Sequence, residues 1–116
     1  MREIKFRAWS QVSEKMTKSF NLEWLKFNTP VPKDFTKEAG FADDLIFMQY
    51  TGLKDKNGVE IYEGDIVRNR SIDKTIGEVI FKGVGFIVME EGVSTTLIDD
   101  KYEVIGNIYQ NPELLK

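Results

Sequence analysis

Apolar residues recur at every second position in two segments near the start of the chain. Residues 4–8 alternate apolar and polar side chains, and residues 20–24 repeat this pattern. A period of two is typical of a strand that buries one face, so we predict strands over 4–9 and 19–27. Met16 is expected to anchor a returning hairpin strand between them. The apolar positions expected on the buried faces are Ile4, Phe6, Ala8, Phe20, Leu22 and Trp24.

Compact apolar runs, separated by glycine and polar residues, follow in the rest of the chain. The pair Asn57-Gly58 predicts a tight turn because both residues readily adopt positive φ. The sequence Gly83-Val84-Gly85 predicts a hairpin between two of the runs. The strands predicted in this part cover residues 45–50, 61–67, 77–82, 86–89 and 102–109.

Three local signals refine these predicted strands. Because the chain enters a predicted strand through Gly64, Asp65 can accept hydrogen bonds from backbone N–H groups in the preceding turn. Gly106 interrupts the last strand, which indicates a bulge. The sequence Asn111-Pro112-Glu113 combines a helix-capping residue, a proline at the first helical position and an acid in the first turn, so we predict a helical turn that continues through Leu115.

Short strands with glycine punctuation, without a long amphipathic helix or a repeat, indicate an all-β or β-dominated fold. A length of 116 residues corresponds to a single domain, here predicted over residues 1–116. We expect antiparallel strands in a small barrel, with an SH3-like arrangement in the C-terminal half. Residues 28–44 contain two prolines and a glycine, so they are predicted as a loop with one helical turn at most.

The composition restricts the chemistry that the chain can perform. It contains neither Cys nor His, which excludes disulfide scaffolds, thiol or Ser–His nucleophiles, structural zinc and haem. The net charge of −3 also differs from the basic character of most nucleic-acid-binding domains. Residues 1–58 carry 10 basic and 8 acidic side chains, whereas residues 59–116 carry 6 and 11. The N-terminus mixes charges with apolar residues, so we expect a cytoplasmic protein without a membrane anchor.

Three blocks of the sequence are informative when they are considered together. They are Met1 to Trp9, Met48 to Val67, and Glu103 to Leu115, and they are distributed from the start of the chain to its end in a fixed order. In this order and spacing the chain resembles the YopX family of small phage and prophage proteins. The resemblance implies a β-rich fold, a phage genomic context and life in the bacterial cytoplasm. It implies no catalytic or cofactor-binding residues.

The block from Gly52 to Asp65 carries the most distinctive chemistry. One interpretation is a recognition loop around Tyr50 and Tyr62, and the other is a turn scaffold. The side chains that such a loop would present are Lys54, Asp55, Lys56 and Glu60. We favour the scaffold for its glycines and aspartates, since both residue types stabilise turns. The tyrosines fit a core edge or an interface equally well.

A second candidate surface lies on the first predicted strand. Lys5, Arg7 and Trp9 fall on the face opposite the apolar positions, where the indole could stack on bases and the cations could bind phosphates. A solvated strand face is the simpler interpretation, because long basic side chains often cover an exposed ring.

Acidic residues form three adjacent pairs, at Asp43-Asp44, Glu90-Glu91 and Asp99-Asp100. Carboxylates are suitable ligands for Mg²⁺, but neighbouring residues of an extended chain point to opposite faces. Gly83-Val84-Gly85 lacks the third glycine and the helix of a dinucleotide-binding loop. We therefore expect no catalytic residue, metal or cofactor, and we rank a Mg²⁺-dependent enzyme last.

The function predicted from these observations is a non-enzymatic binding module of phage origin. We expect contacts with a phage or host protein and assembly into a homo-oligomer. The alternative is a nucleic-acid-binding accessory protein of phage replication or regulation. It would act through Lys5, Arg7 and Trp9, with help from Lys54 and Lys56, and would lose affinity steeply with salt.

Overall fold

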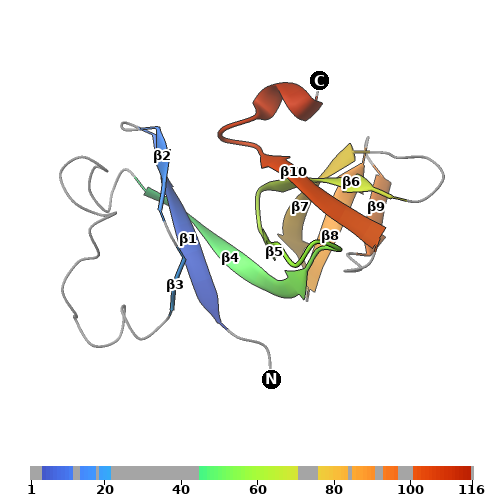
Figure 1. Cartoon of the computed structure of the whole chain (residues 1–116), viewed down its shortest axis with the longest axis horizontal. Coiled ribbons are helices and arrows are strands. Elements are labelled where there is room, and N and C mark those ends of the chain that lie inside the picture. Colours follow the sequence, from blue (N-terminus) through green and yellow to red (C-terminus); the bar gives the residue numbers. More distant parts are fainter. Residues whose placement is uncertain are drawn as a thin grey trace. The chain divides into compact units, whose positions relative to one another are not determined.

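A computed structural model gives the fold in two compact units, residues 1–50 and residues 51–116, each described here by itself (Figure 1). The single domain expected over the whole chain stays a prediction. The structure describes residues 4–11, 14–17, 19–21, 45–70, 76–83, 85–90, 93–96 and 101–115.

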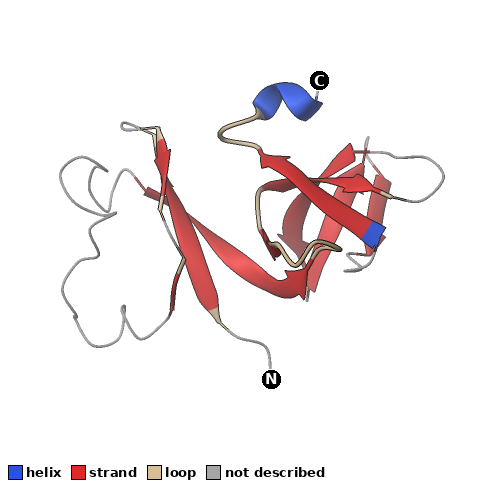
Figure 2. Cartoon of the chain, in the orientation of Figure 1, coloured by secondary structure: helices blue, strands red, loops and turns tan. Residues whose placement is uncertain are grey.

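Strands dominate both units, and the paired strands with a determined register are antiparallel (Figure 2). The predicted β-dominated fold class is confirmed, including a curled half-barrel and a short C-terminal helical turn. The strands are β1 (Lys5–Ser10), β2 (Lys15–Met16), β3 (Phe20–Asn21), β4 (Leu45–Lys54), β5 (Glu60–Tyr62), β6 (Asp65–Asn69), β7 (Ile76–Lys82), β8 (Gly85–Glu90), β9 (Val93–Thr96) and β10 (Tyr102–Asn107), followed by the 3-10 helix η5 (Pro112–Leu115).

In the first unit, β1 pairs with β2, β3 and the first part of β4. Met16 lies opposite Trp9, which confirms the predicted hairpin. The predicted burial of β1 is only partly right, because Ala8 is fully buried whereas Ile4 is 46% exposed. Phe6 is half-buried and stacks on Phe20. Leu22 and Trp24, expected on the same strand as Phe20, lie outside the described residues.

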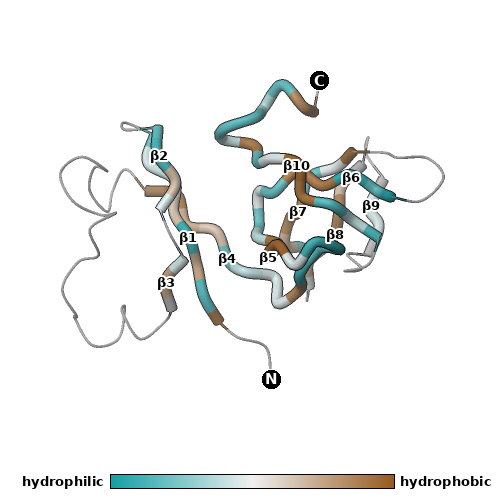
Figure 3. Tube along the Cα trace, viewed as in Figure 1, coloured by the Kyte–Doolittle hydropathy of each residue, from teal (hydrophilic) through white to brown (hydrophobic). Residues whose placement is uncertain are grey.

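In the second unit, the strand order β10-β6-β7-β8-β9 forms one sheet. Its two end strands meet, since the Thr95 and Tyr102 hydroxyl groups lie 3.2 Å apart and form a hydrogen bond. Contact between the two ends of the strand order requires the sheet to curl, which gives the half-barrel. Figure 3 shows hydrophobic stretches on β7 and β10. The core of this unit consists of Ile61, Val67, Val79, Val88 and Tyr102, with Leu53, Phe86 and Val104 packed against it.

The predicted turn signals of the second unit are confirmed in detail. Asp65 accepts a hydrogen bond from the Tyr62 backbone N–H at 2.8 Å, and this turn divides the predicted strand 61–67 into β5 and β6. The register of β10 against β6 shifts between Val104 and Gly106, which is the predicted bulge. Strand β9 was not predicted, because four residues rich in Ser and Thr carry no alternating pattern.

Candidate functional site

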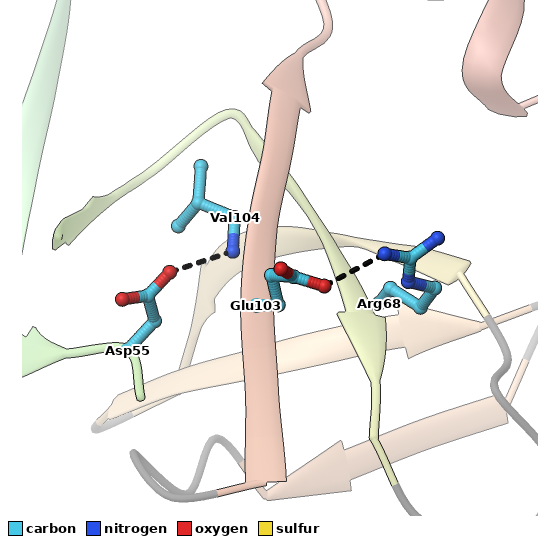
Figure 4. Close-up of polar contacts among 4 residues, drawn as sticks. All are labelled: Asp55, Arg68, Glu103 and Val104. Carbon is cyan, nitrogen blue, oxygen red and sulfur yellow. Dashed lines mark hydrogen bonds and ion pairs between the residues drawn. The ribbon is translucent and has the colours of Figure 1, made fainter. Parts of the chain in front are cut away.

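The segment between β4 and β5 is a loop fixed by the carboxylate of Asp55. One carboxylate oxygen accepts hydrogen bonds from the backbone N–H groups of Asn57 at 2.8 Å and Val59 at 2.9 Å. The other oxygen accepts a bond from the Val104 N–H at 3.0 Å, so it ties the loop to β10 (Figure 4). Gly58 adopts a φ of 83°, as the predicted tight turn requires.

These contacts determine the charge state of Asp55, which is 6% exposed. Burial alone would raise the pKa of this carboxyl group. The backbone hydrogen bonds from Val104, Val59 and Asn57, with the charge of Lys56, outweigh burial and hold the pKa below its ordinary value of 3.8. Asp55 is therefore an ionised structural acceptor, and Asp65 is likewise bound to backbone. The scaffold interpretation of this block fits both residues.

Strand β10 lies between Asp55 and Arg68, and its residue Glu103 forms a surface ion pair with Arg68 (Figure 4). Glu103 accepts a bond from the Arg68 guanidinium at 2.7 Å, and the two residues lie directly opposite each other on β10 and β6. The Arg68 hydrogen bond is the largest of the causes that lower the pKa of Glu103 below its ordinary value of 4.5. Lys56 and Asn57 also lower this pKa, which indicates that the loop approaches the carboxylate.

A surface hollow of about 360 Å³ lies at this ion pair. Lys56 lines it from the loop, Arg68 and Asn69 from β6, Arg70 from just beyond β6, and Glu103 from β10. Three cationic side chains therefore surround one carboxylate. We call this surface hollow the charged hollow.

The structure brings only some of the predicted site residues together. Lys54, at the end of β4, and Lys56, in the loop, are both exposed, as a recognition surface requires. Tyr50 and Tyr62 are each 5% exposed, so neither ring is open to solvent as a recognition surface would require. The Tyr62 hydroxyl donates a hydrogen bond to Glu60 at 3.2 Å. The loop thus presents its lysines without the two tyrosines.

The predicted stripe on β1 requires a correction. Trp9 is only 7% exposed, so its indole offers no open stacking surface. The alternating pattern failed here because the last three residues of β1 are all buried, and both faces of the strand are covered at that end. Arg7 is half-buried, while the Lys5 ammonium lies 5.0 Å from the centre of the Tyr50 ring. Lys5 therefore makes a cation–π contact within its own unit.

Four residues of the charged hollow were missed by the sequence analysis, namely Arg68, Asn69, Arg70 and Glu103. A signal was present, because Arg68 and Arg70 are two positions apart and follow the apolar pair Ile66-Val67. Without the register of β6 against β10, however, neither the partner of Arg68 nor the approach of the loop can be deduced.

The acidic pairs remain without a structural account. Asp43-Asp44, Asp99-Asp100 and Glu91 lie outside the described residues, and so does the side chain of Glu90. Among the residues that the structure describes, no three Asp or Glu side chains gather closely enough to hold a metal ion. Within the same ranges, no helix combines the length and apolar character needed to cross a bilayer.

A curled antiparallel sheet, a carboxylate-pinned loop and a charged hollow define a small half-barrel protein with a polar surface site. The sequence pattern described as "YopX protein" matches residues 5–116, and the chain belongs to the YopX family. The chain is also similar to the crystal structure of protein EF1440 from Enterococcus faecalis. The TM-score is 0.67 and the identity 29%, over 100% of both chains. Among curated proteins, none matches the chain.

Proposed function

We propose that this YopX-family protein is a non-enzymatic binding module, encoded by a phage or prophage, that acts through protein–protein contacts, including contacts between copies of itself. The observation that carries the proposal is the use of the Asp55 carboxylate. All three of its hydrogen bonds go to backbone N–H groups, so the carboxylate serves to hold the loop. A loop fixed in this way loses little conformational entropy on binding.

The side chains that this loop presents are suitable for a protein interface. Val59 is 46% exposed and stands beside the exposed Lys56 and Asn57, so an apolar contact has polar neighbours. Protein interfaces combine an apolar centre with a polar rim in the same way. A further exposed aromatic residue, Phe81, is 48% exposed and packs edge-on against Phe86 at 5.0 Å.

Self-association is the part of the proposal that purified protein can test. We expect sedimentation velocity to show an oligomer whose fraction rises with concentration. Val59→Ser and Phe81→Ser should lower that fraction, because each removes exposed apolar surface. Ile4→Ser is the matched control, since Ile4 is as exposed as Val59 but lies outside the loop and the β7–β8 hairpin. A strict monomer that also forms no cross-link with any phage or host protein would end the proposal.

Nucleic-acid binding through Lys5, Arg7 and Trp9 is the weaker alternative. The buried indole removes the stacking ring on which it depended. Retained affinity of a Lys5→Gln, Arg7→Gln variant for single-stranded DNA would contradict this alternative, whereas a steep loss of wild-type affinity with salt would support it.

A further inference from the structure

We propose that the charged hollow binds the phosphate group of a small phosphate monoester. This site goes beyond the proposed function, because a module that binds proteins needs no anion site. It also differs from the stripe on β1, since its residues belong to the second unit.

The charge balance of the hollow is the first argument. Among the lining residues that the structure describes, three cations and one carboxylate leave an excess of two positive charges, although residues 59–116 carry 6 basic and 11 acidic side chains. A phosphate monoester carries about −1.5 to −2 charges at neutral pH, which balances this excess. A carboxylate or a phosphodiester carries one charge and would leave part of it uncompensated.

The donors are the second argument. Each guanidinium group is a planar fork with five N–H donors, and Glu103 accepts one bond from Arg68 at 2.7 Å. The Arg68 side chain remains 45% exposed, so a ligand can approach the rest of its fork. Two guanidinium groups and one ammonium group suit the several oxygens of a phosphate, and bidentate Arg–phosphate contacts are among the strong hydrogen bonds.

The frame of the hollow is the third argument, because it is built before any ligand arrives. Asp55 fixes the turn that carries Lys56 and bonds it to Val104 on β10. The Arg70 backbone N–H donates to the Lys101 carbonyl at 2.7 Å, which continues the β6–β10 pairing past the end of β6. A preorganised set of donors costs less free energy to order on binding.

Size and surroundings restrict the ligand to a compact one. A volume of about 360 Å³ lies at the lower end of the range for small-molecule sites, about 300–1,000 Å³. The described residues that line the hollow are polar or charged, and none of these five is aromatic. The hollow is therefore expected to contact the phosphate group of the ligand rather than an aromatic ring. The net charge of −3 disfavours binding of a long polyanion.

The test uses the full chain and follows backbone amide NMR signals during titration with inorganic phosphate and, separately, with adenosine monophosphate. We expect saturable shifts at residues 56, 68–70 and 103 with both probes, and none with adenosine. Equal affinities for the two probes would assign the site to the phosphate alone. Tighter binding of the nucleotide would assign it to the monoester. Both outcomes support the proposal.

The variants locate the site. Arg68→Gln and Arg70→Gln should each weaken binding at least about tenfold, because each removes charged hydrogen bonds. Lys82→Gln is the matched control, since it also removes one exposed positive charge but lies at the opposite end of β7 from Ile76, the partner of Arg68. Glu103→Gln should bind severalfold more tightly, because it removes the competing carboxylate, and loss of folding cannot produce such a gain.

Three results would overturn the proposal. The first is the absence of a saturable shift with either phosphate probe. The second is an equal affinity for phosphate in Arg68→Gln, Arg70→Gln and Lys82→Gln. The third is preferential binding of an oligonucleotide without terminal phosphates, which would assign the hollow to a nucleic-acid backbone instead.

Discussion

At the scale of single residues, the second unit depends on two carboxylates that serve the backbone. Asp55 and Asp65 are 6% and 1% exposed, and both accept bonds from main-chain N–H groups. Buried N–H groups must be bonded, because an unsatisfied one costs about 1–3 kcal/mol. The two aspartates thus stabilise backbone turns, and replacing either one should lower the stability of the fold more than it weakens binding.

Replacing Asp55 tests this structural role directly. Asp55→Ala removes the acceptor of three backbone bonds, and we expect the free energy of unfolding to fall by about 2–4 kcal/mol. Asp55→Asn keeps one carbonyl oxygen and should lose about half as much. Chemical denaturation measures both values. A loss as small as that of Lys54→Ala, an exposed residue next to it, would contradict the role assigned to the carboxylate.

The same residue predicts a pH dependence with a defined sign. The pKa of Asp55 is lower in the folded state than its ordinary value of 3.8, so the folded state favours the ionised form. Its contribution to stability is complete well above pH 3.8 and is lost as the pH falls through the folded-state pKa. We expect the stability difference between the wild type and Asp55→Asn to shrink as denaturation curves are measured at increasingly acid pH. A difference that stays constant down to pH 2 would contradict this linkage.

Glu78 on β7 should behave in the opposite way. It is half-buried, and burial raises its pKa above the ordinary value of 4.5. The ionised form therefore costs stability, and this cost appears as the pH rises from 4.5 through the folded-state pKa. Glu78→Gln should raise the free energy of unfolding at neutral pH, and with it the melting temperature. The gain should be no more than about 1 kcal/mol, because solvent screens a half-exposed charge. The gain should vanish at pH 3, where both side chains are neutral.

At the scale of elements, the C-terminal helix η5 is attached to the bulge of β10. A Cβ atom at Gly106 would lie 2.6 Å from Oδ1 of Asn111 and 2.9 Å from Leu114. The same Asn111 oxygen accepts a bond from the Asn107 backbone N–H at 3.2 Å. The bulge and the helix therefore share one tightly packed contact.

Gly106→Ala should displace Asn111 and lower stability by about 1–3 kcal/mol, as overpacking does in other interiors. The double variant Gly106→Ala, Asn111→Ala should lose less than the sum of the two single variants, because removal of Asn111 takes away the colliding oxygen. Thermal unfolding of the four proteins measures the coupling. Additive losses would show that the two positions are independent.

The elements also show how far a sequence can be interpreted. The turns at Asp65 and Gly58 and the bulge at Gly106 were predicted, because each depends on a residue type with a specific local geometry. The burial of β1 was predicted only in part, since Trp9 and Ala8 are neighbours and both are buried. Which strand faces are covered depends on chain packed from elsewhere, and periodicity carries no such information.

At the scale of the whole molecule, the two units pose a question about cooperativity. The described core residues of the second unit all belong to residues 51–116 themselves. We therefore expect a fragment of residues 51–116 to fold alone and to unfold cooperatively, since domains of this length can do so. Circular dichroism and denaturant titration check this prediction. A fragment without a cooperative transition would favour the single domain expected from chain length.

The candidate site was harder to predict than the fold for the same long-range reason. Lys54 and Lys56 were found because they flank a recognisable turn. Arg68 and Glu103 are 35 positions apart and meet only through the pairing of β6 with β10. Charge patterns in the sequence locate the members of such a pair, but only strand register brings them together.

The bond between Asp55 and Val104 also has a consequence for the growing chain on the ribosome. Its two ends are 49 residues apart, and translation at about 5–20 residues per second separates their synthesis by roughly 2 to 10 seconds. During that interval the carboxylate has no distant partner, and the turn around it rests on local bonds alone. The nascent protein therefore passes through a stage in which only local bonds can hold the Lys56 turn, because β10 has not yet been made.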